Sequence, residues 1–257
     1  MNRKNDSISN DNVIIFEGSN ATIGYTARTV TLGKEFDMVE KYITHLKEKY
    51  SKLKSKKVAI FIEPQIDTGY PDLVIIEYYT LQEKSWNMDR ESLNNTDYKI
   101  LFYVQLHKNL SIQEICSTLG FSYEVTLNSL LKLDRCSLVH ISTSRNYVRN
   151  VVLNTYFRIS KIIAVEAKID KWQEAIRQAN NNIWFSSESY IMMNRGSCSE
   201  HILETCKQLG IGIILVNGKN ETILKSDKRK LPVSYASLQF NEWLLRYLYR
   251  KGDNNDH

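Results

Sequence analysis

Two uninterrupted apolar runs, at residues 73–76 and 162–165, dominate the hydrophobic pattern of this chain. Both consist of aliphatic residues, most of them β-branched, and lack the polar alternation of a half-exposed strand. They therefore predict strands that are covered on both faces. Apolar residues at spacings of three and four across 35–54 predict an amphipathic helix before the first run.

The remaining apolar pattern adds shorter elements on either side. Strands are predicted at 58–62, 189–192, 211–216 and 221–224, and helices at 171–180, 199–209 and 234–250. Two more strands, at 13–16 and 23–30, are expected to form a hairpin because a turn-rich sequence joins them. The alternation of strand and helix after residue 168 implies an α/β layer architecture. The last helix carries an apolar surface that something must cover.

The segment 86–155 has a different, mainly helical pattern. It predicts a helix over 98–106, a helix over 112–119, a third helix with apolar residues from 125 to 133, and strands over 138–141 and 147–153. Ser111 and Glu114 form a capping box at the start of the second helix. Gly120 can adopt the left-handed conformation that turns the chain into the third. This order of elements looks like a winged helix-turn-helix domain.

Charged residues stand at the ends of the two dominant runs. Glu166 and Lys168 end the second run two positions apart, so they project from the same face of the strand. Asp72 begins the first run, directly after Pro71. Because an unpaired buried charge is costly, such residues call for a metal, a counter-charge or a solvent-filled cleft.

These residues carry a family resemblance. Pro71-Asp72 followed by Glu166-Ala167-Lys168 resembles the motif of the PD-(D/E)xK nuclease superfamily. The resemblance continues through positions where relatives carry a helix with a glutamine and then a strand with an aromatic, here Trp172, Ala175, Gln178, Ala179 and Tyr190. It covers about two thirds of the chain, roughly residues 36–80 and 160–217.

The chain departs from the family in the separation of the half-motifs, which relatives usually join by a short hairpin. The resemblance implies a restriction-endonuclease-like mixed sheet core flanked by helices, an α/β fold. Here the core would be interrupted by the winged helix-turn-helix domain. We expect residues 1–85 and 156–257 to form the two parts of the core and 86–155 to form the inserted domain.

The motif residues suit metal-dependent phosphodiester hydrolysis, which needs a polarised phosphoryl oxygen and a positioned water. Asp72 and Glu166, on adjacent strands, are hard-oxygen ligands of the kind that Mg²⁺ accepts, with Mn²⁺ as the alternative ion. The resemblance implies the carbonyl of Ala167 as a further ligand. Lys168 would face the same cleft, where it would orient the attacking water or help to deprotonate it.

The helix after Lys168 offers one more site residue. We expect Gln178 to contact the metal-bound water or a phosphate oxygen, although Gln173 competes for that role. Trp172 and Tyr190 are expected to pack in the core or the cleft wall rather than stack on bases.

Extra carboxylates are also candidates. Some relatives place one on the first long helix, where this chain has Glu40. Glu63 and Glu77 are further candidates, and the sequence does not rank them.

The third helix of the inserted segment predicts a DNA-binding surface. Its polar residues and the basic residues of the following hairpin are Ser122, Tyr123, Thr126, Asn128, Ser129, Lys132, Arg145 and Arg149. The helix itself is not strongly basic, because Glu124 and Asp134 oppose Lys132 and Arg135. A dimerising or architectural module is therefore the competing interpretation.

Composition and net charge add little to this functional interpretation. The net charge of +5 and pI of about 8.8 are compatible with a polyanionic partner. The four cysteines have no metal-site spacing, so reduced thiols in a cytoplasmic protein are expected. The polar first twelve residues suit a flexible arm, and no stretch reaches transmembrane length.

The sequence thus predicts a metal-dependent DNA endonuclease with Asp72, Glu166 and Lys168 at its site, acting on duplex DNA. A homodimer would provide two sites for double-strand cutting, with the C-terminal helix as one interface candidate. The alternatives are a non-enzymatic DNA-binding regulator built on a nuclease-like scaffold and an RNA-directed nuclease.

Overall fold

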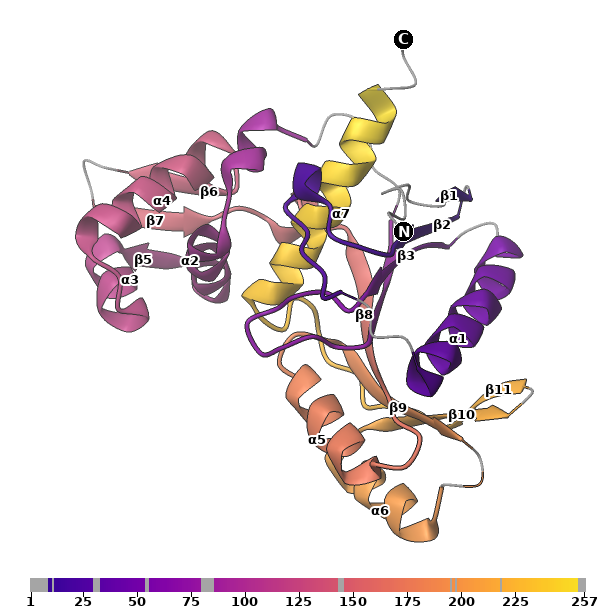
Figure 1. The fold of residues 1–257 in the computed structure, drawn as a ribbon. Helices are drawn as coiled ribbons and strands as arrows, with labels where there is room; N and C mark the ends of the chain where they lie inside the picture. Colours follow the sequence, from indigo (N-terminus) through magenta and orange to yellow (C-terminus); the bar gives the residue numbers. More distant parts are fainter. Residues whose placement is uncertain are drawn as a thin grey trace. The chain divides into compact units, whose positions relative to one another are not determined.

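The structure is a computed structural model, and it describes residues 9–10, 12–29, 33–53, 56–79, 86–142, 146–194, 196, 198–217 and 219–253. Contacts within the chain divide it into two compact units (Figure 1). We call residues 1–80 and 159–233 the sheet unit, and residues 81–158 and 234–257 the helical unit. None of the helices within the described ranges is long and apolar enough to cross a membrane.

In the described part of the sheet unit, eight strands form a mixed sheet in the order β1-β2-β3-β4-β8-β9-β10-β11. The strands are β1 Ser9–Asn10, β2 Val13–Phe16, β3 Lys57–Ile62, β4 Leu73–Tyr78, β8 Ile159–Ala167, β9 Glu188–Asn194, β10 Gly212–Asn217 and β11 Lys219–Leu224. β4 pairs antiparallel with both β3 and β8, and β9 pairs parallel with both β8 and β10. The two dominant apolar runs of the sequence thus lie next to each other in the middle of the sheet.

Helices cover both faces of this sheet (Figure 1). α1 (Lys34–Ser51) packs on one face, where its apolar stripe meets alternate residues of β2, β3, β4 and β8, including Val165 and Ala167. α5 (Trp172–Asn182) and α6 (Glu200–Leu209) pack on the other. Because side chains alternate along a strand, Glu166 points away from α1 and toward the α5 face. The predicted α/β layer architecture is confirmed at this level.

The expected N-terminal hairpin is wrong. β2 is present but pairs parallel with β3. The short helix η1 (Ala21–Ile23) ends at the first residue of the predicted strand 23–30, where Tyr25 and Ala27 form only isolated bridges. The Asn20 side chain caps η1, and Gly24 follows it in the left-handed conformation with φ 72°. This local capping overrides the apolar pattern that suggested a strand.

The helical unit combines helices with a three-stranded antiparallel sheet in the order β5-β7-β6. Its elements are η3 Met88–Ser92, α2 Asn95–Leu106, β5 Asn109–Ser111, α3 Ile112–Leu119, α4 Tyr123–Arg135, β6 Val139–Ser142, β7 Tyr147–Asn150, η5 Leu153–Thr155 and α7 Tyr235–Asp253. The capping box of Ser111 with Glu114 and the left-handed Gly120 are present, as predicted. The predicted helices and hairpin of this segment are therefore confirmed as elements.

The C-terminal helix α7 lies in the helical unit, which corrects the expectation that residues 156–257 all belong to the core around the large sheet. Its apolar residues Phe240, Trp243 and Leu244 are buried. α7 packs on α2. This packing supplies the cover that the sequence called for, so the apolar face of α7 is not a free dimer interface.

Candidate functional site

The pairing of β4 with β8 brings the two half-motifs together. Leu73 is opposite Val165 in the antiparallel register, which sets Asp72 beside Glu166 and Ala167 at the same edge of the sheet. The Asp72 Oδ2 atom accepts a hydrogen bond of 2.7 Å from the backbone N–H of Ala167. Residues separated by the whole inserted segment thus meet at one point.

Glu166 is buried, with 2% of its surface exposed. Its Oε1 atom accepts a hydrogen bond of 2.6 Å from Nδ2 of Asn182, in the last turn of α5. No donor satisfies its buried Oε2 atom, and Glu166 can share a hydrogen bond with the Asp72 side chain only while one of the two carboxyl groups keeps a proton. Burial and then the nearby charge of Asp72 raise the pKa of Glu166 to about 8, against the opposing effects of Asn182 and Lys168. When Glu166 ionises, the surrounding groups offset little of its negative charge.

Asp72 has a related environment. Burial raises the pKa of Asp72, and the positive charge of Lys168 and the Ala167 N–H act in the opposite direction. Two neighbouring carboxylates with raised pKa values repel each other when both are ionised. The site therefore favours a cation that would offset this charge.

Lys168 provides one positive charge at this edge. Its Nζ atom lies 3.3 Å from Glu35 Oε2 and 3.9 Å from Asp72 Oδ2, and it donates to the Ala167 carbonyl at 3.2 Å. Burial alone would lower the pKa of Lys168, but the charges of Asp72 and Glu35 outweigh it and raise the pKa. Lys168 is accordingly an ammonium at neutral pH.

A pocket of about 470 Å³ opens onto this group. Its polar lining includes Arg28, Lys34, Glu35, Glu63, Tyr70, Asp72, Lys168 and Gln178. Glu166 does not line the pocket. It is buried in the sheet beside Asp72. Gln178 reaches the pocket with a buried Oε1 atom that has no hydrogen-bond partner, whereas Gln173 is exposed. The structure thus favours Gln178 over Gln173.

Two carboxyl groups and a backbone carbonyl provide oxygen atoms at this edge of the sheet. Within the described residues, no group of three or more His, Cys, Asp and Glu side chains is arranged to hold a metal. Mg²⁺ is commonly held by only one or two carboxylates, with water and substrate oxygens completing its shell. Asp72 and the unpartnered Oε2 of Glu166 are such a pair, and the Ala167 carbonyl lies at the same edge.

The other candidate carboxylates lie in three different places. Glu63 lines the pocket and faces Arg28, with 3.5 Å between Oε2 and Nε. Glu77 is at the far end of β4, where it accepts hydrogen bonds from the Tyr50 hydroxyl and the Lys56 ammonium. Glu77 is therefore a structural residue.

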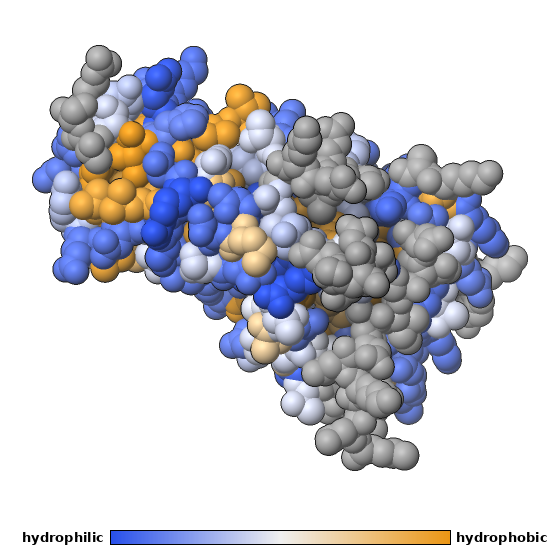
Figure 2. All heavy atoms as spheres, turned by 90° about the horizontal axis from the view of Figure 1, so that it is seen from above, coloured by the Kyte–Doolittle hydropathy of each residue, from blue (hydrophilic) through white to orange (hydrophobic). Residues whose placement is uncertain are grey.

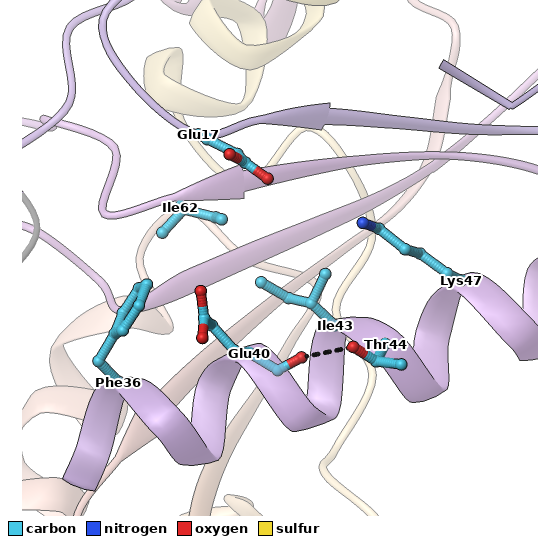
Figure 3. A pocket seen from close by; sticks show the side chains of 7 residues that line it. All are labelled: Glu17, Phe36, Glu40, Ile43, Thr44, Lys47 and Ile62. Atoms are coloured by element: carbon cyan, nitrogen blue, oxygen red, sulfur yellow. Dashed lines mark hydrogen bonds between the residues drawn. The ribbon is translucent and has the colours of Figure 1, made fainter. Parts of the chain in front are cut away.

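Glu40 does not line the pocket of Asp72 and Lys168. It lines a second pocket of about 260 Å³, between α1 and the strands β2 and β3. Figure 3 shows Glu40 there with Glu17 and Lys47. The carboxylate that α1 contributes near Lys168 is instead Glu35, in the first turn of the helix.

Sequence reasoning missed Glu35 and Asn182. Glu35 lies five positions before Glu40, at a helix start that the apolar pattern locates only approximately. Asn182 is the last of three consecutive asparagines beyond the predicted helix end at residue 180. Nothing in the sequence distinguishes the buried asparagine from its two neighbours.

Trp172 and Tyr190 serve packing, as expected. Trp172 packs edge-on against His201 at a centroid distance of 5.5 Å. Tyr190 is part of the core under α1, and its hydroxyl donates to Glu188 at 2.9 Å.

The residues predicted to contact DNA in the helical unit differ in accessibility. Tyr123, Asn128 and Arg149 are exposed. Ser122 is exposed as the N-cap of α4, with its hydroxyl accepting from the Val125 N–H. Arg145 lies outside the described residues.

Two predicted DNA contacts on α4 are wrong, because Thr126 and Ser129 are buried. Thr126 accepts a hydrogen bond from the Cys116 thiol of α3. Lys132 is half-buried and paired with Asp97 at 3.3 Å. The helix phase turns these side chains into the unit, which leaves α4 with fewer polar groups for a nucleic acid than predicted.

Comparisons with protein-family models, with curated proteins and with solved structures give no match to this chain. The interpretation of the site therefore depends on its geometry and on the motif in the sequence.

Proposed function

We propose that this chain is a metal-dependent endonuclease that hydrolyses DNA phosphodiester bonds, with its active site at Asp72, Glu166 and Lys168. The observation that carries the proposal is the buried, unpartnered Oε2 of Glu166 beside Asp72, at the edge of a pocket that also contains Lys168. An uncompensated buried carboxylate is costly to keep. A divalent cation would remove that cost.

The order of elements supports the finer assignment of the sheet unit as a restriction-endonuclease-like core. α1 precedes β3 and β4, and β8, α5 and β9 follow on the other side of the inserted segment. This is the order that the resemblance to the PD-(D/E)xK superfamily implies. The three-helix and hairpin order of the helical unit supports a winged helix-turn-helix fold in the same way.

A Mg²⁺ ion held by Asp72 and Glu166 would supply the positive charge that polarises the phosphoryl oxygen. Lys168 is charged at neutral pH because Asp72 and Glu35 raise its pKa. This favours a role in which its ammonium orients the attacking water and offsets phosphate charge over a role as general base.

The rest of the pocket suits a phosphate-bearing substrate. Arg28 and Lys34 line it with Lys168, so cations lie beside the carboxylates. The free Oε1 of Gln178 can accept a hydrogen bond from a water molecule there. We therefore propose that the sheet unit itself holds the scissile phosphate, with the exposed Arg149 of the helical unit as a secondary contact.

Cleavage assays test this function. Plasmid, linear duplex, single-stranded DNA and RNA are incubated with wild type, Asp72→Asn and Lys168→Ala in Mg²⁺ or Mn²⁺. We expect the wild type to cut DNA, and each variant to lose about 10³-fold or more in rate, because each removes a group that acts on the reacting phosphate. Asp170→Asn and Lys171→Ala, at exposed neighbouring positions, serve as matched controls and should retain activity.

The outcomes separate the alternatives. Cleavage of RNA but not DNA would make the protein an RNA-directed nuclease at the same site. Absence of cleavage with either metal, together with retained duplex binding, would contradict the proposal and make the protein a DNA-binding regulator. Equal activity in wild type, Asp72→Asn and Lys168→Ala would locate the activity elsewhere.

A further inference from the structure

The outward face of α4 has a self-complementary arrangement of residues. Glu124, Asn128, Leu131 and Arg135 are all exposed. With 3.6 residues per turn, their spacings of four, three and four put them within about 60° of arc. The buried residues Thr126, Leu130 and Leu133 lie on the opposite side of the helix. We call the four exposed residues the α4 stripe.

The α4 stripe is symmetric about its own centre. Glu124 and Arg135 lie equally far, about 8 Å, from a point between Ser129 and Leu130, because each residue adds 1.5 Å along the axis. Asn128 and Leu131 flank the same point more closely. If a second α4 packed antiparallel across this point, each Glu124 would be opposite an Arg135 of the other copy. The two Leu131 side chains would meet near the centre.

Apolar exposure around the α4 stripe agrees with a protein contact. Leu131 is 42% exposed, and Tyr123 and Val125, on either flank, are 50% and 44% exposed. Figure 2 shows apolar surface gathered at the left of the view, over the part of the chain that holds α3, α4 and the hairpin. Apolar groups beside a balanced pair of charges suit a protein partner better than a phosphate backbone.

We propose that the α4 stripe is a self-association surface, at which two copies of this chain pack their α4 helices antiparallel about a twofold axis. A twofold contact uses the same patch on both copies, and this requires the self-complementarity that Glu124 and Arg135 supply. One helix pair buries less than the roughly 1,200 Å² of a standard interface, so the association belongs to the weak class. The inference does not depend on the nuclease activity.

Charge reversal gives a direct test by sedimentation velocity over a range of protein concentrations at low salt. Glu124→Arg and Arg135→Glu each turn both symmetry-related ion pairs into repulsive contacts. We expect each single variant to weaken dimerisation by about tenfold. Both residues are exposed, so circular dichroism should show intact folding. Lys108→Glu, at an exposed position outside the α4 stripe, is the control and should dimerise like the wild type.

Restoration makes the test specific to this geometry. The double variant Glu124→Arg with Arg135→Glu should dimerise again, because both pairs are re-formed with exchanged charges. An equimolar mixture of the two single variants should form heterodimers for the same reason. A second measurement, of duplex DNA binding, tests whether the α4 stripe contacts DNA instead of a second copy of the chain.

Three results would overturn the proposal. The first is a wild type that stays monomeric at all concentrations. The second is a dimer that both single variants leave unchanged. The third is a monomeric chain whose duplex binding strengthens with Glu124→Arg and weakens with Arg135→Glu, which would make the α4 stripe a DNA contact.

Discussion

Each of the two units buries charged residues, but the buried carboxyl groups differ in their hydrogen-bond partners and in the charge beside them. In the helical unit, Arg90 and Glu242 are 1% and 2% exposed and form two parallel hydrogen bonds, from Nε to Oε2 and from a terminal nitrogen to Oε1. In the sheet unit, Glu166 is equally buried, yet only one of its oxygens has a partner. The neighbouring charged group of Glu242 is a cation, whereas Glu166 adjoins the carboxylate of Asp72.

The difference shows how to distinguish a structural charge from a functional one. The Arg90–Glu242 pair joins η3 to α7, and Arg246 adds hydrogen bonds to the carbonyls of Arg90 and Leu93 and to the Tyr98 hydroxyl. These contacts satisfy the groups they bury and fix α7 in its unit. Glu166 keeps one buried oxygen without a donor beside the Asp72 carboxylate, and Lys168, 3.9 Å from Asp72, offsets only part of the negative charge. A fold does not need such an arrangement, so we attribute it to ligand binding.

The largest effect on stability is expected from breaking the matched pair. Glu242→Ala leaves the Arg90 guanidinium buried without its carboxylate, which should lower the free energy of unfolding by about 3–5 kcal/mol in urea titrations. Glu91→Ala removes a partly exposed pair with Arg250 and should cost less than about 1 kcal/mol. Equal losses in the two variants would show that the buried pair has no special role.

The second-largest effect is expected at Glu166, where a substitution should raise the free energy of unfolding rather than lower it. Glu166→Gln removes a carboxylate whose pKa rises from 4.5 to about 8 on folding. Between these pH values the folded state holds a proton that the unfolded state has released, so the metal-free wild type loses stability as pH rises from 4.5 to 8. The variant lacks that loss. It should therefore be more stable than the wild type at pH 8, by on the order of 4 kcal/mol.

Thermal unfolding in the presence of a chelator checks this prediction at both ends of the range. The advantage of Glu166→Gln should vanish near pH 4.5, and the exposed control Glu204→Gln should show no such pH dependence. A variant that is less stable than the wild type at pH 8 would show that Glu166 is compensated in the fold.

A smaller change is expected at Asn182. Its side chain holds Oε1 of Glu166 and so directs the carboxylate. Asn182→Ala should weaken Mn²⁺ binding by about tenfold, as is usual when a partner of a metal ligand is removed. Asn181→Ala, at the exposed neighbouring position, should leave the affinity unchanged. Calorimetric titration distinguishes the two, and equal affinities would exclude a positioning role for Asn182.

The smallest effect is expected at Glu77, the candidate that the structure places away from the pocket. Glu77→Gln keeps a hydrogen-bond acceptor for Tyr50 and loses only the charge opposite Lys56. We expect a change in unfolding free energy within about 1 kcal/mol and an unchanged cleavage rate. A large loss of cleavage would mean that the two ends of β4 are coupled.

Features that depend on short-range periodicity were predictable from the sequence. The two apolar runs are paired central strands. The period of two predicted that Glu166 and Lys168 share one cleft, but the strand ends at Ala167, and Lys168 lines the pocket while Glu166 is buried. The capping residues Ser111 and Gly120 correctly marked the ends of α3. Such features involve only a few neighbouring residues, so they can be read from the chain.

The features that the sequence did not predict depend on tertiary packing. The burial of Thr126 results from how α4 packs on α3 and its other neighbours, and the position of α7 results from its partners in a segment more than a hundred residues earlier. Glu35 and Asn182 join the candidate site from helix ends, whose phase the apolar pattern leaves uncertain by a residue or two. Contacts of this kind become visible only in the fold.

A Mn²⁺ titration followed by electron paramagnetic resonance tests the central claim most directly, because it reports on the uncompensated carboxylates without requiring a substrate. We predict a saturable Mn²⁺ site in the wild type and in Asp170→Asn, and its loss in both Asp72→Asn and Glu166→Gln. Absence of binding in the wild type, or equal binding in all four proteins, would contradict the account.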